Sequence, residues 1–168
     1  WDEARDIFAV RLGLERLVVS TLAGQLTAEQ ATRLRRHVKE EETARGSNEP
    51  LSIRLAGEFH ILLADMTGNA LLARYVGEVT SRSGLILALY GRPHSSECAV
   101  SEHRAIIDAL DSGNAQRANT LMQEHLDAVA GRALIQMKPQ KRRDLRDILA
   151  AYALGTAAPP SPRARRRR

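Results

Sequence analysis

The chain has 168 residues, which is enough for one globular domain with a sizeable core and short for two. Apolar residues make up 43% of it, charged residues 27% and aromatic residues only 4%, which is typical of a folded, helix-rich domain and not of a disordered chain. One cysteine excludes an intrachain disulfide and a cysteine-rich zinc module, and no apolar run reaches the roughly 20 residues that cross a bilayer, so we expect a cytoplasmic protein with no membrane partner.

The formal charge of +5 comes from the C-terminal end of the chain. Residues from 138 onward include ten basic and two acidic side chains, whereas residues 1–137 include fifteen basic and eighteen acidic ones. The sequence therefore predicts a mildly acidic domain over 1–137, a helical extension over 138–154 and a disordered basic tail over 155–168. The chain already has a helical pattern at Trp1, which suggests a fragment of a longer protein.

Apolar residues recur with helical periodicity through most of the chain, and no segment alternates like a strand. The first helix should end at Gly24, and a capping box at Thr27 and Gln30 should open the second. Gly68 and Gly113 are expected to end the third and fifth helices. The predicted fold is all-α, an antiparallel bundle of six to seven helices. The helices are expected over about 2–23, 27–43, 51–66, 70–90, 97–110, 114–135 and, in the extension, 141–154.

Three of the five histidines lie in the apolar stripes of different predicted helices and should point inward: His60, His103 and His125. Three imidazoles in one core are costly unless they share something polar, and a divalent transition metal is an economical partner. The alternative is three ordinary core histidines, each with its own hydrogen-bond partners. No short metal motif such as HExxH is present. His37 and His94 are expected at the surface.

Four local patterns occur between about residues 4 and 135. They are Arg11 with Glu15, then Glu58-Phe59-His60 followed by Leu62-Leu63 and Gly68-Asn69, then Glu102-His103 with Ile106, Ala109 and Leu110, and finally Ala118, Met122, His125 and Leu126. Together they resemble the FCD domain, the C-terminal domain of GntR-type transcriptional regulators of the FadR kind. The pair of Glu and His with its downstream Ala, Met, His and Leu is the most specific part.

The resemblance implies a helical bundle that dimerises and binds a small metabolite, commonly a carboxylate, in a central cavity. Many such domains hold a metal there through one Asp and three His, which by position are His60, His103 and His125. The Asp would stand one helical turn before His60, where this chain has Ala56. Zinc or nickel could still bind three histidines, with water or the effector carboxylate in the open position, or metal could bind weakly or not at all.

Two arginines are candidates for contacting an effector carboxylate. Arg11 either forms a surface ion pair with Glu15 or projects into the cavity, as the matching arginine does in FCD domains. Arg82, in the mostly apolar fourth predicted helix, is a second candidate. Glu58 and Glu102 cannot replace the missing Asp, because each lies on a different helix face from the histidine beside it.

These patterns predict the ligand-sensing and dimerisation domain of a GntR-type regulator. Operator DNA would be bound by an upstream winged-helix domain that is not in this chain. An effector would change helix packing at a homodimer interface, for which the exposed apolar residues of the first and fourth helices are candidates. Two alternatives stay open: a metal-dependent enzyme that activates water, and a metal-free module that only dimerises. No phosphate-binding loop or nucleophile elbow supports another chemistry.

Overall fold

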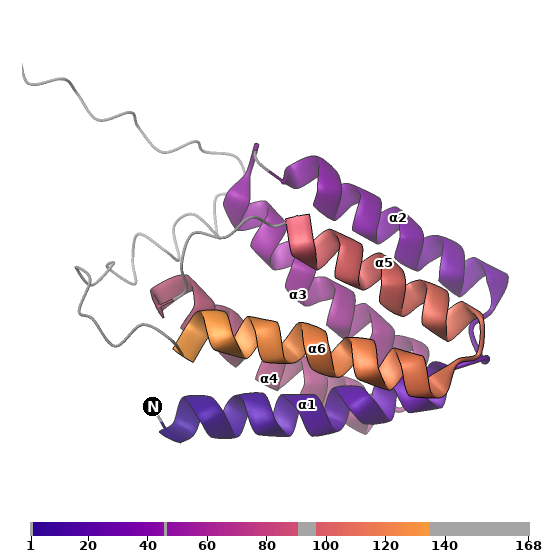
Figure 1. Cartoon of the computed structure of the whole chain (residues 1–168), viewed down its shortest axis with the longest axis horizontal. Coiled ribbons are helices and arrows are strands. Elements are labelled where there is room, and N and C mark those ends of the chain that lie inside the picture. Colours follow the sequence, from indigo (N-terminus) through magenta and orange to yellow (C-terminus); the bar gives the residue numbers. More distant parts are fainter. Residues whose placement is uncertain (1, 46, 91–96, 135–168) are drawn as a thin grey trace, which may run out of the picture.

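The computed structural model describes residues 2–45, 47–90 and 97–134, which form a helical bundle (Figure 1). The helices are α1 (Asp2–Leu22), α2 (Ala28–Ala44), α3 (Glu49–Met66), α4 (Ala70–Tyr90), α5 (Glu97–Asp111) and α6 (Ala115–Leu134). These bounds agree closely with the predicted ones, and the all-α fold is confirmed. The predicted extension over 138–154 and the basic tail lie outside the described residues. No described helix combines the length and apolar character needed to cross a membrane.

Local hydrogen bonds set the helix starts that the sequence predicts. The Thr27 hydroxyl accepts the backbone N–H of Gln30 at 3.1 Å, and the Gln30 side chain accepts the N–H of Thr27 at 2.9 Å, which completes the predicted capping box of α2. The Asn48 side chain likewise accepts the N–H of Leu51 at 3.1 Å and begins α3.

Each helix packs mainly against two others, so that the six close into a ring in the spatial order α1, α6, α5, α2, α3, α4. Figure 1 shows α1 lying beside α6 and α2 beside α5. The large side chains that fill the interior of the ring are fully buried: Leu34, Phe59, Leu63, Ile106, Ile107, Leu110 and Met122. The ring therefore surrounds a core to which each of the six helices contributes its inward-facing side chains.

A buried polar layer divides this apolar interior along the helices. The smaller of the two apolar clusters consists of Phe8, Val129 and Ala133, and the other includes most of the remaining core. On α1, the buried residues Arg11 and Glu15 follow Phe8, and on α6 the buried His125 precedes Val129. Charged and polar side chains thus lie between two apolar regions, where they must find partners within the protein.

A contact between two glycines closes the end of the bundle where α1 turns into α2 and α5 turns into α6. Gly24 and Gly113 have φ angles of +71° and +72°. The N–H of Gly24 donates to the carbonyl of Leu110 at 2.9 Å, and a Cβ added to Gly24 would lie 3.3 Å from the Cα of Gly113. Both the left-handed backbone and the close approach favour glycine here.

We expect Gly24→Ala to lower the free energy of unfolding by about 2 to 3 kcal/mol, because the left-handed conformation costs about 1 to 2 kcal/mol and the facing backbone cannot move aside cheaply. Gly68→Ala is the matched control, since Gly68 also has a φ of +71° but nothing lies within 4 Å of its added Cβ. Urea unfolding measures both variants. Equal losses would show that the glycine contact adds nothing to the backbone strain.

Candidate metal and effector site

Three histidines come together inside the bundle, as the sequence predicts: His60 of α3, His103 of α5 and His125 of α6. They are 2%, 0% and 3% exposed. The Nε2 atom of His125 lies 3.2 Å from Nε2 of His60 and 3.4 Å from Nε2 of His103. The Phe59 ring stacks on His103, with centroids 4.0 Å apart. One ligand atom from each histidine lies within 4.8 Å of the others, so the three could form a single metal site.

The other ring nitrogen of each histidine faces a glutamate from a different helix. The Nδ1 pairs are His60 with Glu15 of α1, His103 with Glu41 of α2 at 2.9 Å, and His125 with Glu102 of α5 at 2.6 Å. Glu15 and Glu41 are buried, and the side chain of Glu102 is 31% exposed. The cluster therefore joins five helices through imidazole and carboxylate groups.

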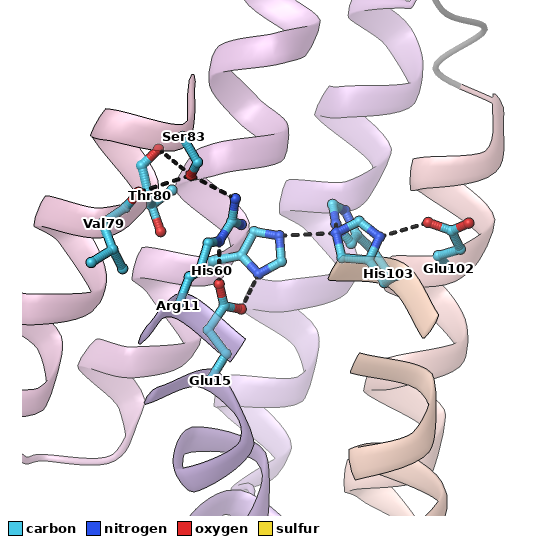
Figure 2. Close-up of polar contacts among 9 residues, drawn as sticks. Arg11, Glu15, His60, Val79, Thr80, Ser83, Glu102 and His103 are labelled. Atoms are coloured by element: carbon cyan, nitrogen blue, oxygen red, sulfur yellow. Dashed lines mark hydrogen bonds and ion pairs between the residues drawn. The ribbon is translucent and has the colours of Figure 1, made fainter. Parts of the chain in front are cut away.

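Arg11 extends this cluster to the remaining helix. Its side chain is buried, its Nε donates to Oε1 of Glu15 at 2.6 Å, and its Nη1 donates to the Ser83 hydroxyl of α4 at 2.9 Å. Figure 2 shows the resulting chain from Ser83 through Arg11 and Glu15 to His60. Of the two interpretations of Arg11, the surface ion pair is wrong, because the pair with Glu15 lies in the interior.

Burial and the neighbouring charges set the ionisation of the cluster. Burial lowers the pKa of His60 to about 4, although Glu15 opposes this, and burial together with the neighbouring histidines lowers the pKa of His125 well below its usual value. Burial acts to raise the pKa of Glu15, but His60 and the Arg11 guanidinium outweigh it and hold that pKa well below the usual range. The arrangement favours neutral imidazoles at His60 and His125 and an ionised carboxylate at Glu15.

Two residues lie in other environments than the sequence predicts. Arg82 is 53% exposed at its side chain and pairs with Glu78 at 2.9 Å, so the expectation that it faces the interior is wrong, and the adjacent Ser83 faces inward instead. His37, which is expected at the surface, is half-buried, and its Nε2 lies 2.8 Å from the carbonyl of Leu55. His94 lies outside the described residues.

The position where the FCD resemblance places an Asp provides no metal-ligating atom. Ala56 is half-buried and its methyl side chain offers no donor atom. Glu58 points away and pairs with Arg54 at 3.4 Å, as its helix face predicts. Glu102 also leaves the face of His103, as expected, but it reaches across to His125.

Sequence reasoning missed Glu41. It stands in a run of charged residues, Lys39 to Glu42, that resembles an exposed helix face. The usable signal is its spacing, because Glu41 follows the apolar residues Leu34 and Val38 at helical intervals and shares their buried face. A carboxylate on an apolar face needs a buried partner, and His103 is that partner.

Comparisons with known proteins agree with this geometry. Residues 6–128 match the family model described as the FCD domain. An HTH-type transcriptional regulator of Bacillus subtilis (strain 168), YdhC, itself uncharacterized, is 28% identical over 125 residues, which make up 73% of this chain and 56% of the regulator.

A solved structure of Streptococcus agalactiae GntR resembles the fold with a TM-score of 0.66 at 27% identity, covering 76% of this chain and 57% of that one. The chain thus spans a little more than half the length of both relatives. Because the family model matches most of the chain and the six-helix bundle agrees with it, the chain belongs to the FCD domain family of GntR-type transcriptional regulators.

Proposed function

We propose that this chain is the ligand-sensing and dimerisation domain of a GntR-type regulator and that it holds a divalent transition metal, zinc or nickel, at His60, His103 and His125. The observation that carries the proposal is that the buried Nε2 atom of His125 lies 3.2 Å from Nε2 of His60 and 3.4 Å from Nε2 of His103. Neutral imidazole nitrogens are good ligands for zinc and nickel, and three histidines from three helices match the protein ligands of an open zinc site.

A shared cation explains the cluster better than three separate core histidines. Each Nδ1 already faces a glutamate, so the Nε2 atoms of the three rings are directed at one another. Two nitrogen lone pairs that face each other in the interior are unfavourable, and a metal ion would bond to all three Nε2 atoms in place of the two contacts made by His125. Ala56 leaves a coordination position for water or for an effector carboxylate.

Arg11 is the proposed anchor for a small carboxylate effector. It is buried beside the cluster, and its guanidinium has five N–H donors, of which Nε is used by Glu15 and Nη1 by Ser83. A carboxylate between the metal position and Arg11 would gain both a coordination bond and a charge-assisted hydrogen bond. One relative is described as an HTH-type transcriptional regulator and the other as a GntR, which favours sensing over the metal-dependent enzyme.

In the complete regulator, this domain would form a homodimer and act on operator DNA through an upstream winged-helix domain. The residues proposed for dimerisation are exposed apolar side chains of α1 and α4, two helices that pack together: Val10 and Leu17 on α1, and Leu71, Tyr75 and Leu85 on α4. An effector that changes how α1 and α4 pack would change the spacing of the two DNA-binding domains.

The metal proposal predicts about one metal ion per chain after incubation with zinc or nickel, since three imidazoles suffice for one open site. Mass spectrometry on protein purified without a histidine tag measures the content. His103→Ala and His125→Ala should lose the metal, whereas His37→Ala should keep it, because His37 contacts Leu55 and not the cluster. Metal in all three variants, or none in the unmodified chain, would contradict the proposal.

The effector proposal predicts that one of a set of small carboxylates, such as succinate, malate, citrate and lactate, raises the melting temperature of the metal-loaded protein. For that carboxylate, Arg11→Lys should weaken binding by about 10- to 100-fold, because a charge-assisted hydrogen bond is worth about 1.5 to 3 kcal/mol. Arg82→Lys is the surface control and should bind normally. Equal binding by both variants would exclude Arg11 as the anchor, with circular dichroism confirming that each is folded.

The dimer proposal predicts that the chain sediments as a dimer and that Tyr75→Glu shifts it towards the monomer, because the change buries a charge in the proposed interface. Ile53→Glu serves as the control, since Ile53 is also an exposed apolar residue but lies on α3. Sedimentation velocity measures both variants. A monomeric unmodified chain would contradict the dimer proposal, and equal effects of the two substitutions would place the interface elsewhere.

A further inference from the structure

The three glutamates behind the histidines form a set that the effector and metal proposals do not use. Each contacts one Nδ1 atom, and each comes from a different helix than its histidine. The glutamates therefore lie on the far side of the imidazole rings from the Nε2 cluster. In that position they cannot be ligands themselves, but they can determine what the rings present at Nε2.

An ionised carboxylate can only accept a hydrogen bond, so each histidine in such a pair must carry its proton on Nδ1. A neutral ring with a proton on Nδ1 has a lone pair on Nε2. With all three pairs in this form, three lone pairs would face the same point. The short Nε2 to Nε2 distances of 3.2 and 3.4 Å are then contacts between acceptors, which a cation would relieve.

Glu41 gives the clearest evidence that these glutamates serve the histidines, because burying its carboxylate would by itself destabilise the fold. Both Glu41 and His103 are 0% exposed, and the second carboxylate oxygen of Glu41, Oε1, is buried without a hydrogen-bond partner among the described residues. A buried carboxylate with an unsatisfied oxygen is costly to the fold. The other oxygen, Oε2, contacts the Nδ1 atom of His103 at 2.9 Å.

We infer that Glu15, Glu41 and Glu102 are positioning residues that keep His60, His103 and His125 protonated on Nδ1 and so direct three Nε2 lone pairs to one cation. The part of the inference that concerns a cation rests on the proposed metal site. Its tautomer statement, however, applies to the metal-free protein as well. The glutamates also supply negative charge behind the ligands, in a site where the expected Asp is Ala56.

The tautomers are tested in metal-free protein by long-range proton–nitrogen NMR of the imidazole rings, which separates a protonated Nδ1 from a protonated Nε2. The three cluster histidines should carry the proton on Nδ1. His37 provides an internal reference of the opposite kind, because its Nε2 must donate to the carbonyl of Leu55. A protonated Nε2 on neutral His103 would overturn the inference.

The effect on metal is tested by zinc affinity, measured by competition with a chelating indicator. Glu41→Gln should weaken zinc binding by about 10- to 100-fold, the usual effect of changing a group that orients a metal ligand. Glu42→Gln is the matched control, because Glu42 also joins α2 to α5, through Arg104 at 2.6 Å, but at the surface. An affinity of Glu41→Gln within about threefold of the unmodified chain would overturn the positioning role.

The two measurements separate this inference from the metal proposal. If the unmodified chain binds no zinc, the metal proposal fails, while the NMR result still decides whether the glutamates set the tautomers. If Glu41→Gln does not fold, Glu102→Gln replaces it, since the Glu102 side chain is 31% exposed and its amide can be solvated. Glu102→Gln should then weaken zinc binding through His125, and unchanged binding would count against the inference.

Discussion

Burying three imidazoles in one apolar core is the constraint on which the rest of the interior depends. A buried ring nitrogen needs a hydrogen-bond partner, and the Nδ1 atom of each histidine faces a carboxylate from another helix. A buried carboxylate in turn needs a positive or donating partner, which Arg11 provides for Glu15 while it also donates to Ser83 of α4. All six helices thus contribute a side chain to one hydrogen-bonded layer between two apolar clusters.

In the proposed regulator, this layer would give the bundle a means of responding to a ligand. Apolar side chains allow neighbouring helices to shift slightly without losing a specific partner, whereas the polar layer has defined donors and acceptors. In the proposed regulator, a carboxylate that competes for the Arg11 guanidinium would weaken its bonds to Glu15 and Ser83. The bond to Glu15 lies within α1, and the bond to Ser83 joins α1 to α4. These two helices carry the exposed apolar residues proposed for the dimer interface. Binding in the interior would therefore act directly on the helices at the interface.

The fold was predictable because helix caps and turns are encoded within a few neighbouring residues. The site was predictable only for those residues whose burial follows from the helical spacing of apolar residues. The glycines at 24, 68 and 113 and the capping box at Thr27 act within a few residues, and the apolar stripes correctly placed the three histidines inside. Arg82 was misplaced because apolar residues occur on several sides of α4, including the exposed Leu85. The pairing of Glu102 with His125 depends on how α5 and α6 pack, which no pattern within one helix reports.

Ala56 in place of an Asp would leave the proposed metal site without a carboxylate ligand of its own. A site with three neutral imidazole ligands keeps the full charge of a divalent cation, and the carboxylates behind the rings compensate that charge from outside the coordination sphere. The position that an Asp would fill is then available to an effector carboxylate, which binds the metal as its own ligand and need not displace a protein group. Metal and effector would therefore strengthen each other's binding, because linkage between two ligands is reciprocal. In this chain the effector would complete the metal site, and the metal would be part of what recognises the effector.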